Sequence, residues 1–215
     1  MSFHDIRVLA IMTSMSFTLW QVALIPSPRP RLFILLGWLT LFAFALEVVG
    51  AYTTREGVNN SVLYNSYAVV ELLFVLIMMR ECQPRWSLII GIGGGCGLGA
   101  LIWAHSMYDG RSFMLIEGIV GSAMVITGLI LAHLLRLARI TERPLQRMPE
   151  FWLWLGFLVY FGGLPPVVGV IRYVFERDAI LSNQLWSIPS FLCVLRYILT
   201  AYASNLQARL THGQQ

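Results

Sequence analysis

Seven stretches of about 20 mainly apolar residues each run through this chain of 215 residues, and they constrain its fold more than any other feature. Only 12% of the residues are charged, against about 25% in an ordinary soluble domain, and the mean hydropathy is +0.70. The composition excludes a water-soluble globule, a disordered chain and a nucleic-acid-binding protein, and it predicts a polytopic membrane protein. The stretches cover residues 6–26, 32–52, 62–80, 86–105, 113–135, 151–175 and 180–202.

The connectors between these stretches are short and contain turn-forming or charged residues, so none can fold independently. The prediction is therefore one all-α transmembrane domain over residues 1–215, built as a seven-helix bundle. We expect the first stretch to be a retained helix and not a cleaved signal peptide, because its start carries only Arg7 beside Asp5 and no A-x-A site follows.

The distribution of arginine predicts the orientation of the bundle. The connectors after the first, third and fifth stretches, together with the C-terminal tail, hold nine arginines, whereas the opposite side holds five. Because basic residues are enriched in cytoplasmic loops, we expect the N-terminus outside and the C-terminus in the cytoplasm. Tryptophans near the predicted helix ends are typical of an interfacial belt: Trp38, Trp86, Trp103, Trp152 and Trp186.

The third stretch carries a polar face. Asn60, Tyr64, Tyr67 and Glu71 are spaced by four, three and four residues, so they share one side of a helix. Glu71 lies nine residues from either predicted end, about 13 Å deep. An ionised carboxylate at that depth costs about 2.5–3.5 kcal/mol on insertion scales. Glu71 is therefore either a protonated structural contact between helices or part of a functional site.

Four more charged residues lie in or near the predicted spans. Glu47 and Glu117 are close enough to the outer ends to be hydrated interfacial charges. Arg172 could pair with the glutamate four residues further on, and Arg196 could reach the cytoplasmic headgroups or pair with Glu71. If the polar faces converge, they form a pocket that opens outward and narrows toward Glu71. The candidate ligand-binding residues are Glu47, Asn60, Tyr64, Tyr67, Glu71, Glu117, Arg172 and Arg196.

Prolines in the last two stretches predict hinges. Pro165 and Pro166 follow Gly162 and Gly163 about midway along the sixth stretch, and Pro189 has a similar predicted depth in the seventh. Proline removes a backbone donor and clashes with the preceding turn, so each helix should kink there. Interrupted helices occur at transporter binding sites, and kinked helices occur in receptors and in inert bundles as well.

Glycine recurs every four residues in the fourth stretch, at Gly91, Gly95 and Gly99. This small-xxx-small spacing predicts close contact with a neighbouring helix. The same segment contains GxGxxG-like matches, but no strand precedes it and no acid follows at the right distance, so we expect no nucleotide site.

A series of arginines follows the fifth stretch. Arg136, Arg139, Arg143 and Arg147 are spaced by three, four and four residues, which predicts one stripe on a helical extension at the cytoplasmic face. Each arginine could contribute about 1 kcal/mol of attraction to anionic lipid. The stripe is either an orientation signal alone or a docking surface for an acidic cytoplasmic partner.

The sequence lacks the residues that several kinds of chemistry require. All 15 basic residues are arginine, which excludes a lysine Schiff base and with it retinal and pyridoxal chemistry. The three cysteines form no CxxC pair, and the histidines lie at opposite predicted membrane faces, so we expect no metal or haem. No G-x-S-x-G motif or nucleophile–base set is visible. We expect no cofactor, and a non-enzymatic role is favoured.

The polar residues of the second and third stretches also form a recognisable pattern. It consists of Glu47, Gly50, Asn59, Asn60, Tyr64, Asn65, Tyr67 and Glu71, followed by Phe151, Trp152 and Gly156 at the start of the sixth stretch. In this pattern the chain resembles a group of small uncharacterised bacterial seven-helix membrane proteins, often encoded near sensor kinases. The resemblance implies a multi-pass protein of the bacterial inner membrane with a signal-input role, in which Glu47, Asn60, Tyr64 and Glu71 are the polar signature.

Three functions stay open at this point. The favoured one is a sensor that binds a small ligand in an outward pocket and signals through a membrane or cytoplasmic protein partner, because the chain carries no output domain. The second is an accessory subunit of a larger membrane complex. The third is a proton- or ion-coupled transporter that uses Glu71, although the sequence shows no internal repeat.

Overall fold

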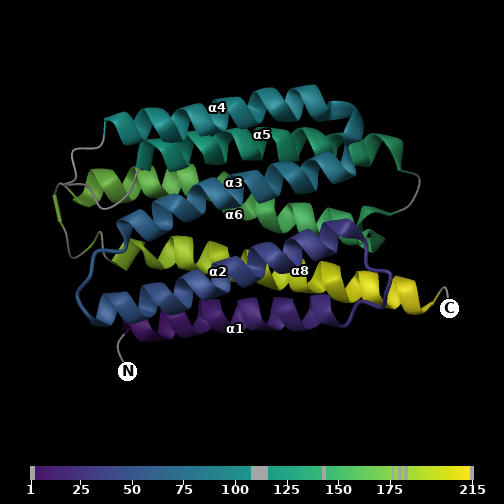
Figure 1. Cartoon of the computed structure of the whole chain (residues 1–215), viewed down its shortest axis with the longest axis horizontal. Coiled ribbons are helices and arrows are strands. Elements are labelled where there is room, and N and C mark those ends of the chain that lie inside the picture. The colour runs from purple at the N-terminus through teal and green to yellow at the C-terminus, as the bar shows by residue number, and fades with distance from the viewer. Residues whose placement is uncertain are drawn as a thin grey trace. The chain divides into compact units, whose positions relative to one another are not determined.

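The computed structural model describes residues 3–107, 116–141, 144–175, 177–178, 181 and 184–213, and in these residues every regular element is a helix (Figure 1). Seven helices of the described segments are long and apolar enough to cross a membrane. The protein is therefore an all-α polytopic membrane protein, as the sequence predicted. The elements are α1 (Phe3–Ala23), α2 (Arg31–Arg55), α3 (Ser61–Cys82), η1 (Pro84–Trp86), α4 (Ser87–Ser106), α5 (Ile116–Ile140), η2 (Leu145–Arg147), α6 (Pro149–Phe175) and α8 (Ser187–His212).

The predicted and observed boundaries differ most in the last helix. A span over 180–202 was predicted, whereas α8 begins at Ser187 and ends at His212. The apolar run ends at Tyr202, where a more polar segment begins. This segment continues the helix, and some of its residues, such as Ser204 and Ala208, are buried. The shift places Pro189 in the first turn of α8, where a missing N–H breaks no helical hydrogen bond. The prediction that Pro189 lies deep in its helix was wrong.

The chain packs as two compact units, and the division falls within α5. Unit 1 consists of Met1–Arg29 and Ile130–Gln215, and unit 2 consists of Pro30–Leu129. Each unit is described below by itself. The expectation that residues 1–215 form one domain stays a prediction.

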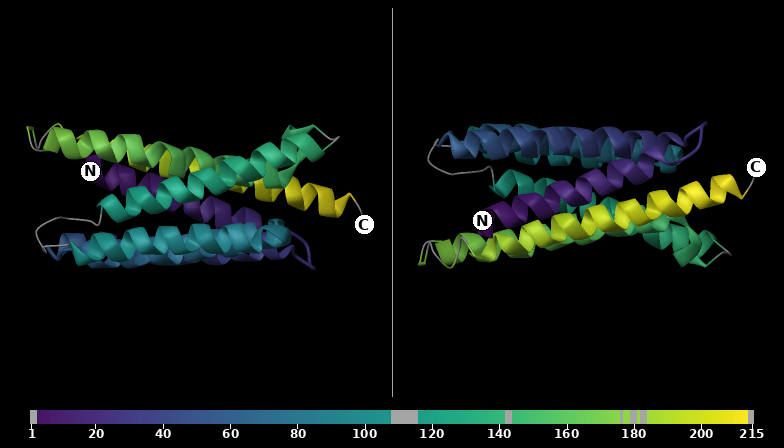
Figure 2. Two further views of the ribbon diagram at one scale, coloured as in Figure 1. Left: turned by 90° about the horizontal axis from the view of Figure 1, so that it is seen from above. Right: turned by 90° about the horizontal axis from the view of Figure 1, so that it is seen from below.

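In unit 1, α8 packs between α1 and α6, and Figure 2 shows α1 and α8 running side by side in the same direction. The Thr18 hydroxyl donates to the Tyr197 carbonyl at 2.8 Å, and Asn205 donates to the Gln21 side-chain oxygen at 3.0 Å. Helix α6 runs antiparallel to α8, since Gly156 lies against the Arg196 carbonyl, whereas Gly163, later in α6, lies against Leu192, earlier in α8. The C-terminal ends of α1 and α8 therefore lie at the same end of unit 1 as the start of α6.

In unit 2, α2 to α4 and the first part of α5 run up and down, each antiparallel to the next. Arg31 at the start of α2 lies 3.9 Å from Glu81 at the end of α3. Gly97 and Gly94 of α4 pack on Leu72 and Leu76 of α3, in reversed order along the two helices. This reversal is expected for helices joined by short connectors.

The glycines that pack α4 are not the predicted ones. A Cβ at Gly94 would lie 2.8 Å from the Leu76 side chain, and a Cβ at Gly97 would lie 3.1 Å from Leu72. At Gly91, Gly95 and Gly99, by contrast, nothing described lies within 4 Å of a Cβ, and all three are exposed. The prediction that this spacing marks a close helix contact within the chain was wrong, because α4 turns a different face toward α3.

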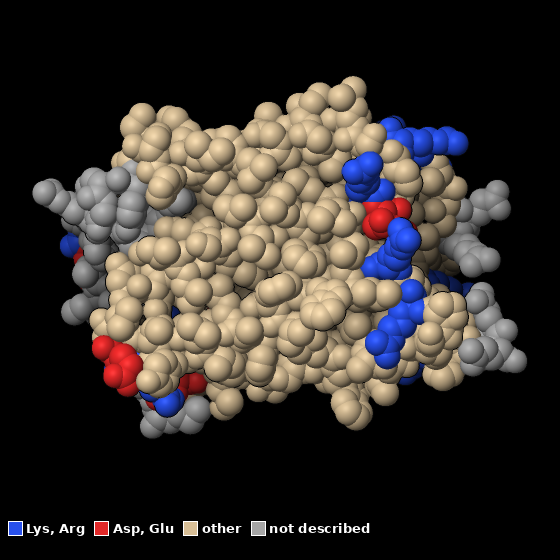
Figure 3. Space-filling view, viewed as in Figure 1, with Lys and Arg blue, Asp and Glu red and all other residues tan. Residues whose placement is uncertain are grey.

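Arginines gather at one end of the helices in each unit. On the face shown in Figure 3, charged side chains lie near helix ends and the surface between them is uncharged. In unit 1 the end with the start of α6 holds Arg29, Arg136, Arg139, Arg147, Arg209 and Glu150, and the other end holds Asp5, Arg7, Arg172, Arg177 and Asp178. In unit 2 the end with the start of α2 holds Arg31, Arg80, Arg85 and Glu81, and the other end holds Arg55, Glu56 and Glu117.

Candidate functional site

The α2–α3 hairpin of unit 2 positions the polar residues that the sequence singled out. Gly57 has a φ of +71°, a conformation that side-chain-bearing residues rarely adopt, and it lets the chain reverse after α2. The Asn59 side chain then accepts a hydrogen bond from the Ser61 backbone N–H at 2.9 Å, which orders the start of α3. We call Glu47, Asn60, Tyr64, Tyr67 and Glu71 the α2–α3 polar stripe.

Asn60 ties the start of α3 to the end of α2. Its side-chain amide donates to the Gly50 carbonyl at 2.9 Å and to the Thr54 hydroxyl at 2.7 Å, and the Thr53 hydroxyl donates to its oxygen. Asn60 is buried, so these bonds replace the water that its amide would otherwise bind. Thr53 and Thr54 were not among the predicted site residues, although two threonines directly before a charged turn were the available signal.

Gly50 allows Tyr64 to lie directly against α2. A Cβ at Gly50 would lie only 2.6 Å from the Tyr64 hydroxyl oxygen, so the absence of a side chain makes room for the phenol. In this position the Tyr64 hydroxyl donates to the Glu47 carboxylate at 3.4 Å. The structure thus brings Glu47, Asn60 and Tyr64 together.

The close approach at Gly50 gives a test by double substitution. We expect Gly50→Ala to cost at least about 0.5 kcal/mol less in a Tyr64→Phe background than in the wild type, because the hydroxyl that collides with the new methyl group is then absent. The measurement is thermal or denaturant unfolding of the four proteins. Gly95→Ala, at an open glycine of α4, is the control and should have the same effect in both backgrounds. An equal cost of Gly50→Ala in both backgrounds would contradict the packing.

Glu71 lies at the middle of α3, as predicted. It is ten residues from Ser61 and eleven from Cys82, about 15 Å from either end of the helix. Its side chain is 7% exposed, and the Tyr67 hydroxyl donates to it at 3.4 Å. A buried carboxyl group at mid-span is costly and is by default a candidate for function.

In the described interior of unit 2, acidic side chains are present and arginines are not. Among its described residues, Glu47 and Glu71 are the ionisable acids within the interior of the spans, and every described arginine lies at a helix end. Carboxylate oxygens accept hydrogen bonds and attract positive charge. The α2–α3 polar stripe is therefore suited to a molecule that donates hydrogen bonds.

Glu117 and Arg172 take other positions. Glu117 is the second residue of α5 and is exposed, a place where a carboxylate interacts favourably with the helix dipole. Arg172 lies in the last turn of α6, and its side chain is outside the described part of the structure. Because Arg172 and Arg196 belong to unit 1, their convergence with the α2–α3 polar stripe stays a prediction.

Arg196 is buried at 2% exposure in the interior of α8 and lies among aromatic rings. Its guanidinium carbon is 4.3 Å from the ring centre of Phe157, 4.9 Å from Tyr160, 5.6 Å from Phe161 and 5.2 Å from Tyr197. Cation–π attraction of this kind is strongest where water is excluded. Burial at this position contradicts the alternative that Arg196 extends to the cytoplasmic headgroups.

The predicted hinge in α6 lies inside an otherwise continuous helix. Pro165 and Pro166 are both within α6, so the carbonyls of Phe161 and Gly162 lose their usual helical donors. The prolines are thus placed where α6 can bend. A hinge function of Pro165, Pro166 and Pro189 stays a prediction.

The arginine stripe is not continuous. Helix α5 ends at Ile140 with Arg136 and Arg139 near its end, whereas Arg147 belongs to the separate η2 turn. Arg143 lies outside the described residues. The prediction of one helical face was wrong, because α5 ends at Ile140 and Arg147 lies in a separate turn.

No protein-family model, curated protein or solved structure matches this chain. The resemblance to bacterial seven-helix membrane proteins therefore stays an expectation. Within the described ranges, no group of three or more histidine, cysteine, aspartate or glutamate side chains is arranged to hold a metal ion.

His133, one of the histidines whose positions argued against a metal or haem site, makes a polar contact outside the α2–α3 polar stripe. His133 of α5 is completely buried, and its Nε2 lies 2.8 Å from the Glu150 carboxylate at the start of α6. Its ring packs edge-on against Trp154, with 5.6 Å between the ring centres. The pair joins α5 to α6 in unit 1. Their separation of 17 residues across a connector gave no local sequence signal.

Proposed function

We propose that this protein is a multi-pass membrane receptor in which the α2–α3 polar stripe binds a small molecule that donates hydrogen bonds. The observation that carries the proposal is the buried Glu71 carboxyl group at mid-span, beside Tyr67, on the same helix as Tyr64 and on the helix that directly follows Asn60. A hydrophobic residue at this position would avoid the cost of placing a carboxyl group in the membrane. A role in binding explains why the carboxyl group is there.

The chemistry of the stripe defines the class of ligand. Glu47 and Glu71 supply carboxyl oxygens that accept hydrogen bonds, and Tyr64 and Tyr67 supply phenol rings and hydroxyl groups beside them. Carboxylates next to aromatic rings favour ammonium groups, through charge-assisted hydrogen bonds and cation–π attraction. We infer that the ligand is a small amine or a neutral hydrogen-bond donor.

The distribution of charge supports an orientation for this receptor. The arginine-rich ends of units 1 and 2 would face the cytoplasm, in agreement with the enrichment of basic residues on that side. Asn60 and Glu47 lie toward the opposite end of the α2–α3 hairpin, so the ligand would enter from outside. A protein partner on the cytoplasmic side would carry the output, and Pro165 and Pro166 would allow α6 to bend in response.

Substitution of Glu71 by glutamine tests the proposal. We measure the thermal unfolding of purified protein with ammonium, ethanolamine and putrescine, and with acetate and succinate as anions of similar size. We expect at least one amine to raise the unfolding temperature of the wild type, and Glu71→Gln to reduce its apparent affinity by about tenfold or more, since a charged hydrogen bond contributes about 1.5–3 kcal/mol. If Glu71→Gln without ligand unfolds at the same temperature as the wild type, its lower affinity reflects a loss of binding and not a loss of stability.

Glu56→Gln is the matched control, because Glu56 is an exposed glutamate beyond the end of α2. This variant should respond to the amines as the wild type does. Stabilisation by anions and not by amines would contradict the proposed ligand class. A proton flux in proteoliposomes that Glu71→Gln abolishes would indicate a transporter in place of a receptor, and no response to any probe would leave Glu71 a structural residue.

A further inference from the structure

The end of α6 has an exposed face that changes from apolar to basic. Pro166, Val170 and Tyr173 follow one another at intervals of four and three residues, so they share one side of the helix. All three are exposed, and Arg177 continues the series just after the helix ends. The apolar part of this face is complementary to the hydrocarbon tail of a phospholipid, and the basic part is complementary to its phosphate headgroup.

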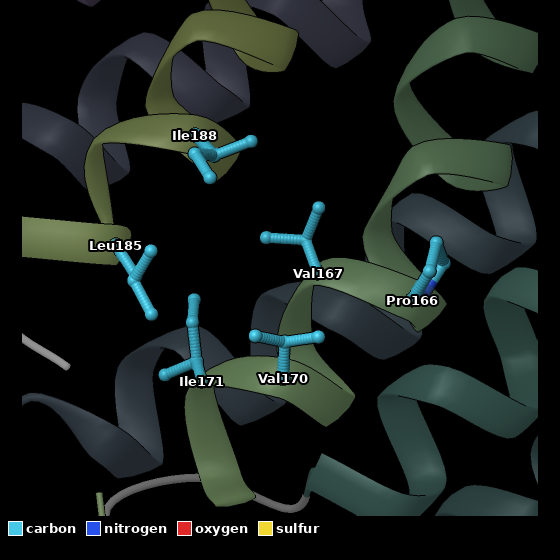
Figure 4. Close-up of a pocket in the computed structure, with 6 residues that line it drawn as sticks. All are labelled: Pro166, Val167, Val170, Ile171, Leu185 and Ile188. Atoms are coloured by element: carbon cyan, nitrogen blue, oxygen red, sulfur yellow. The ribbon is translucent and has the colours of Figure 1, made fainter. Parts of the chain in front are cut away.

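The apolar part of this face is hollowed into a groove of about 210 Å³. Four of its lining residues come from α6, and Leu185 and Ile188 oppose them across the hollow (Figure 4). The lining consists of Pro166, Val167, Val170, Ile171, Leu185 and Ile188. An enclosed apolar cavity of about 150 Å³ stays dry and binds benzene, so this open groove, with its apolar lining, favours hydrocarbon over water.

The groove lies within a span, so the surrounding medium can supply hydrocarbon. Residues Pro149–Ile171 form a candidate membrane span, and Val170 and Ile188 are exposed on the surface. Pro166 is 17 residues from the start of α6, about 25 Å along the helix. The groove is therefore in the leaflet opposite the arginine-rich end of unit 1.

A cation lies beyond the groove in the direction of the headgroups. The Arg177 guanidinium carbon is 4.1 Å from the centre of the Tyr173 ring, which fixes the guanidinium over the same face of α6. The neighbouring Asp178 carboxylate accepts a hydrogen bond from the Leu181 backbone N–H at 3.0 Å, so it is directed to the following turn. A guanidinium group in this position can bind a phosphate with two hydrogen bonds.

We propose that this surface binds one phospholipid molecule, with an acyl chain in the groove and the phosphate at Arg177. The groove alone would accept any hydrocarbon, and Arg177 alone would accept any small anion. Because Arg177 follows the groove on the same face of α6, the two features together favour an amphiphile with an anionic headgroup. The bound chain lies beside the part of α6 that follows Pro165 and Pro166.

Native mass spectrometry and thermal unfolding of the purified full chain test this proposal. The probe is palmitoyl-oleoyl phosphatidylglycerol added to protein in detergent, and glycerol 1-phosphate serves as a headgroup without chains. We expect the wild type to retain one phosphatidylglycerol and to unfold at a higher temperature with it, whereas glycerol 1-phosphate has no effect. Val170→Phe, which fills the groove, should lose the retained lipid, and Arg177→Gln should weaken its binding about tenfold.

The controls separate a bound lipid from general contact with lipid. Ile102→Phe enlarges an exposed apolar residue of α4, and Arg209→Gln removes an exposed arginine of α8. Both controls should bind the lipid like the wild type. Ile188→Phe fills the groove from its other wall and is the second variant if Val170→Phe does not fold. Equal lipid retention in the groove-filling variants and in Ile102→Phe would overturn the proposal, and so would stabilisation by glycerol 1-phosphate alone. Neither result bears on ligand binding at Glu71, because the groove contains no residue of the α2–α3 polar stripe.

Discussion

Replacement of Arg196 by alanine is expected to lower the free energy of unfolding by about 3–5 kcal/mol, the loss typical of truncating a large buried side chain. The guanidinium lies among four aromatic rings, and alanine removes both the cation–π attraction and the volume that these rings pack against. Arg196→Lys should recover only part of the loss, because an ammonium group lacks the planar guanidinium surface that can lie against the rings of Phe157 and Tyr160. The measurement is thermal or denaturant unfolding of the purified protein.

Arg209→Ala is the control for this experiment. Arg209 lies on the same helix but is exposed, so its removal should change the free energy of unfolding by about 0.5 kcal/mol or less. A wild-type unfolding temperature for Arg196→Ala would show that the aromatic cluster does not depend on the cation.

Replacement of Gly156 by valine is expected to destabilise unit 1 by at least about 1–3 kcal/mol, the usual cost of overpacking. A Cβ at Gly156 would lie 3.0 Å from the Arg196 carbonyl oxygen and 3.1 Å from the Leu199 Cβ. One of these neighbours is backbone and the other is the first side-chain atom, so neither can rotate away and α6 must move from α8. Thermal unfolding of the purified variant measures the effect.

Gly169→Val is the matched control on the same helix. Nothing described lies within 4 Å of a Cβ at Gly169, so valine there has room. Because glycine is a poor helix former, this variant should be neutral or slightly stabilised. Similar destabilisation by both valines would mean that the close crossing of α6 and α8 does not determine the stability of unit 1.

Within the described residues, hydropathy predicted the seven candidate spans and their approximate place, because a span requires a long apolar run and little else. It failed at the end of α8, where the residues after Tyr202 are polar but remain helical and partly buried. It also failed for the α4 glycines, since spacing shows which residues share a face but not which face a neighbour covers. Gly94 and Gly97 pack, whereas the regularly spaced Gly91 and Gly95 do not.

The sequence predicted which residues of the candidate site share one face of a helix. It did not predict which contacts they make with a neighbouring helix. The spacing of Tyr64, Tyr67 and Glu71 follows from the helical repeat, and the structure keeps it. The bonds from Asn60 to Gly50 and Thr54 depend on how tightly α3 folds back on α2. The rings around Arg196 show the same limit: Phe157, Tyr160 and Phe161 form a recognisable face of α6, but nothing local shows that Arg196 of another helix meets it.

The pairing of α1 with α8 has a consequence for biosynthesis. The residues joined by the bond from Thr18 to Tyr197 are 179 positions apart, so at about 5–20 residues per second the first helix emerges from the ribosome about 9–36 s before its partner. Residues Pro30–Leu129 are contiguous and can assemble during this interval. The middle section of the nascent chain can therefore assemble first, whereas α1 has its partner only after α8 has been synthesised.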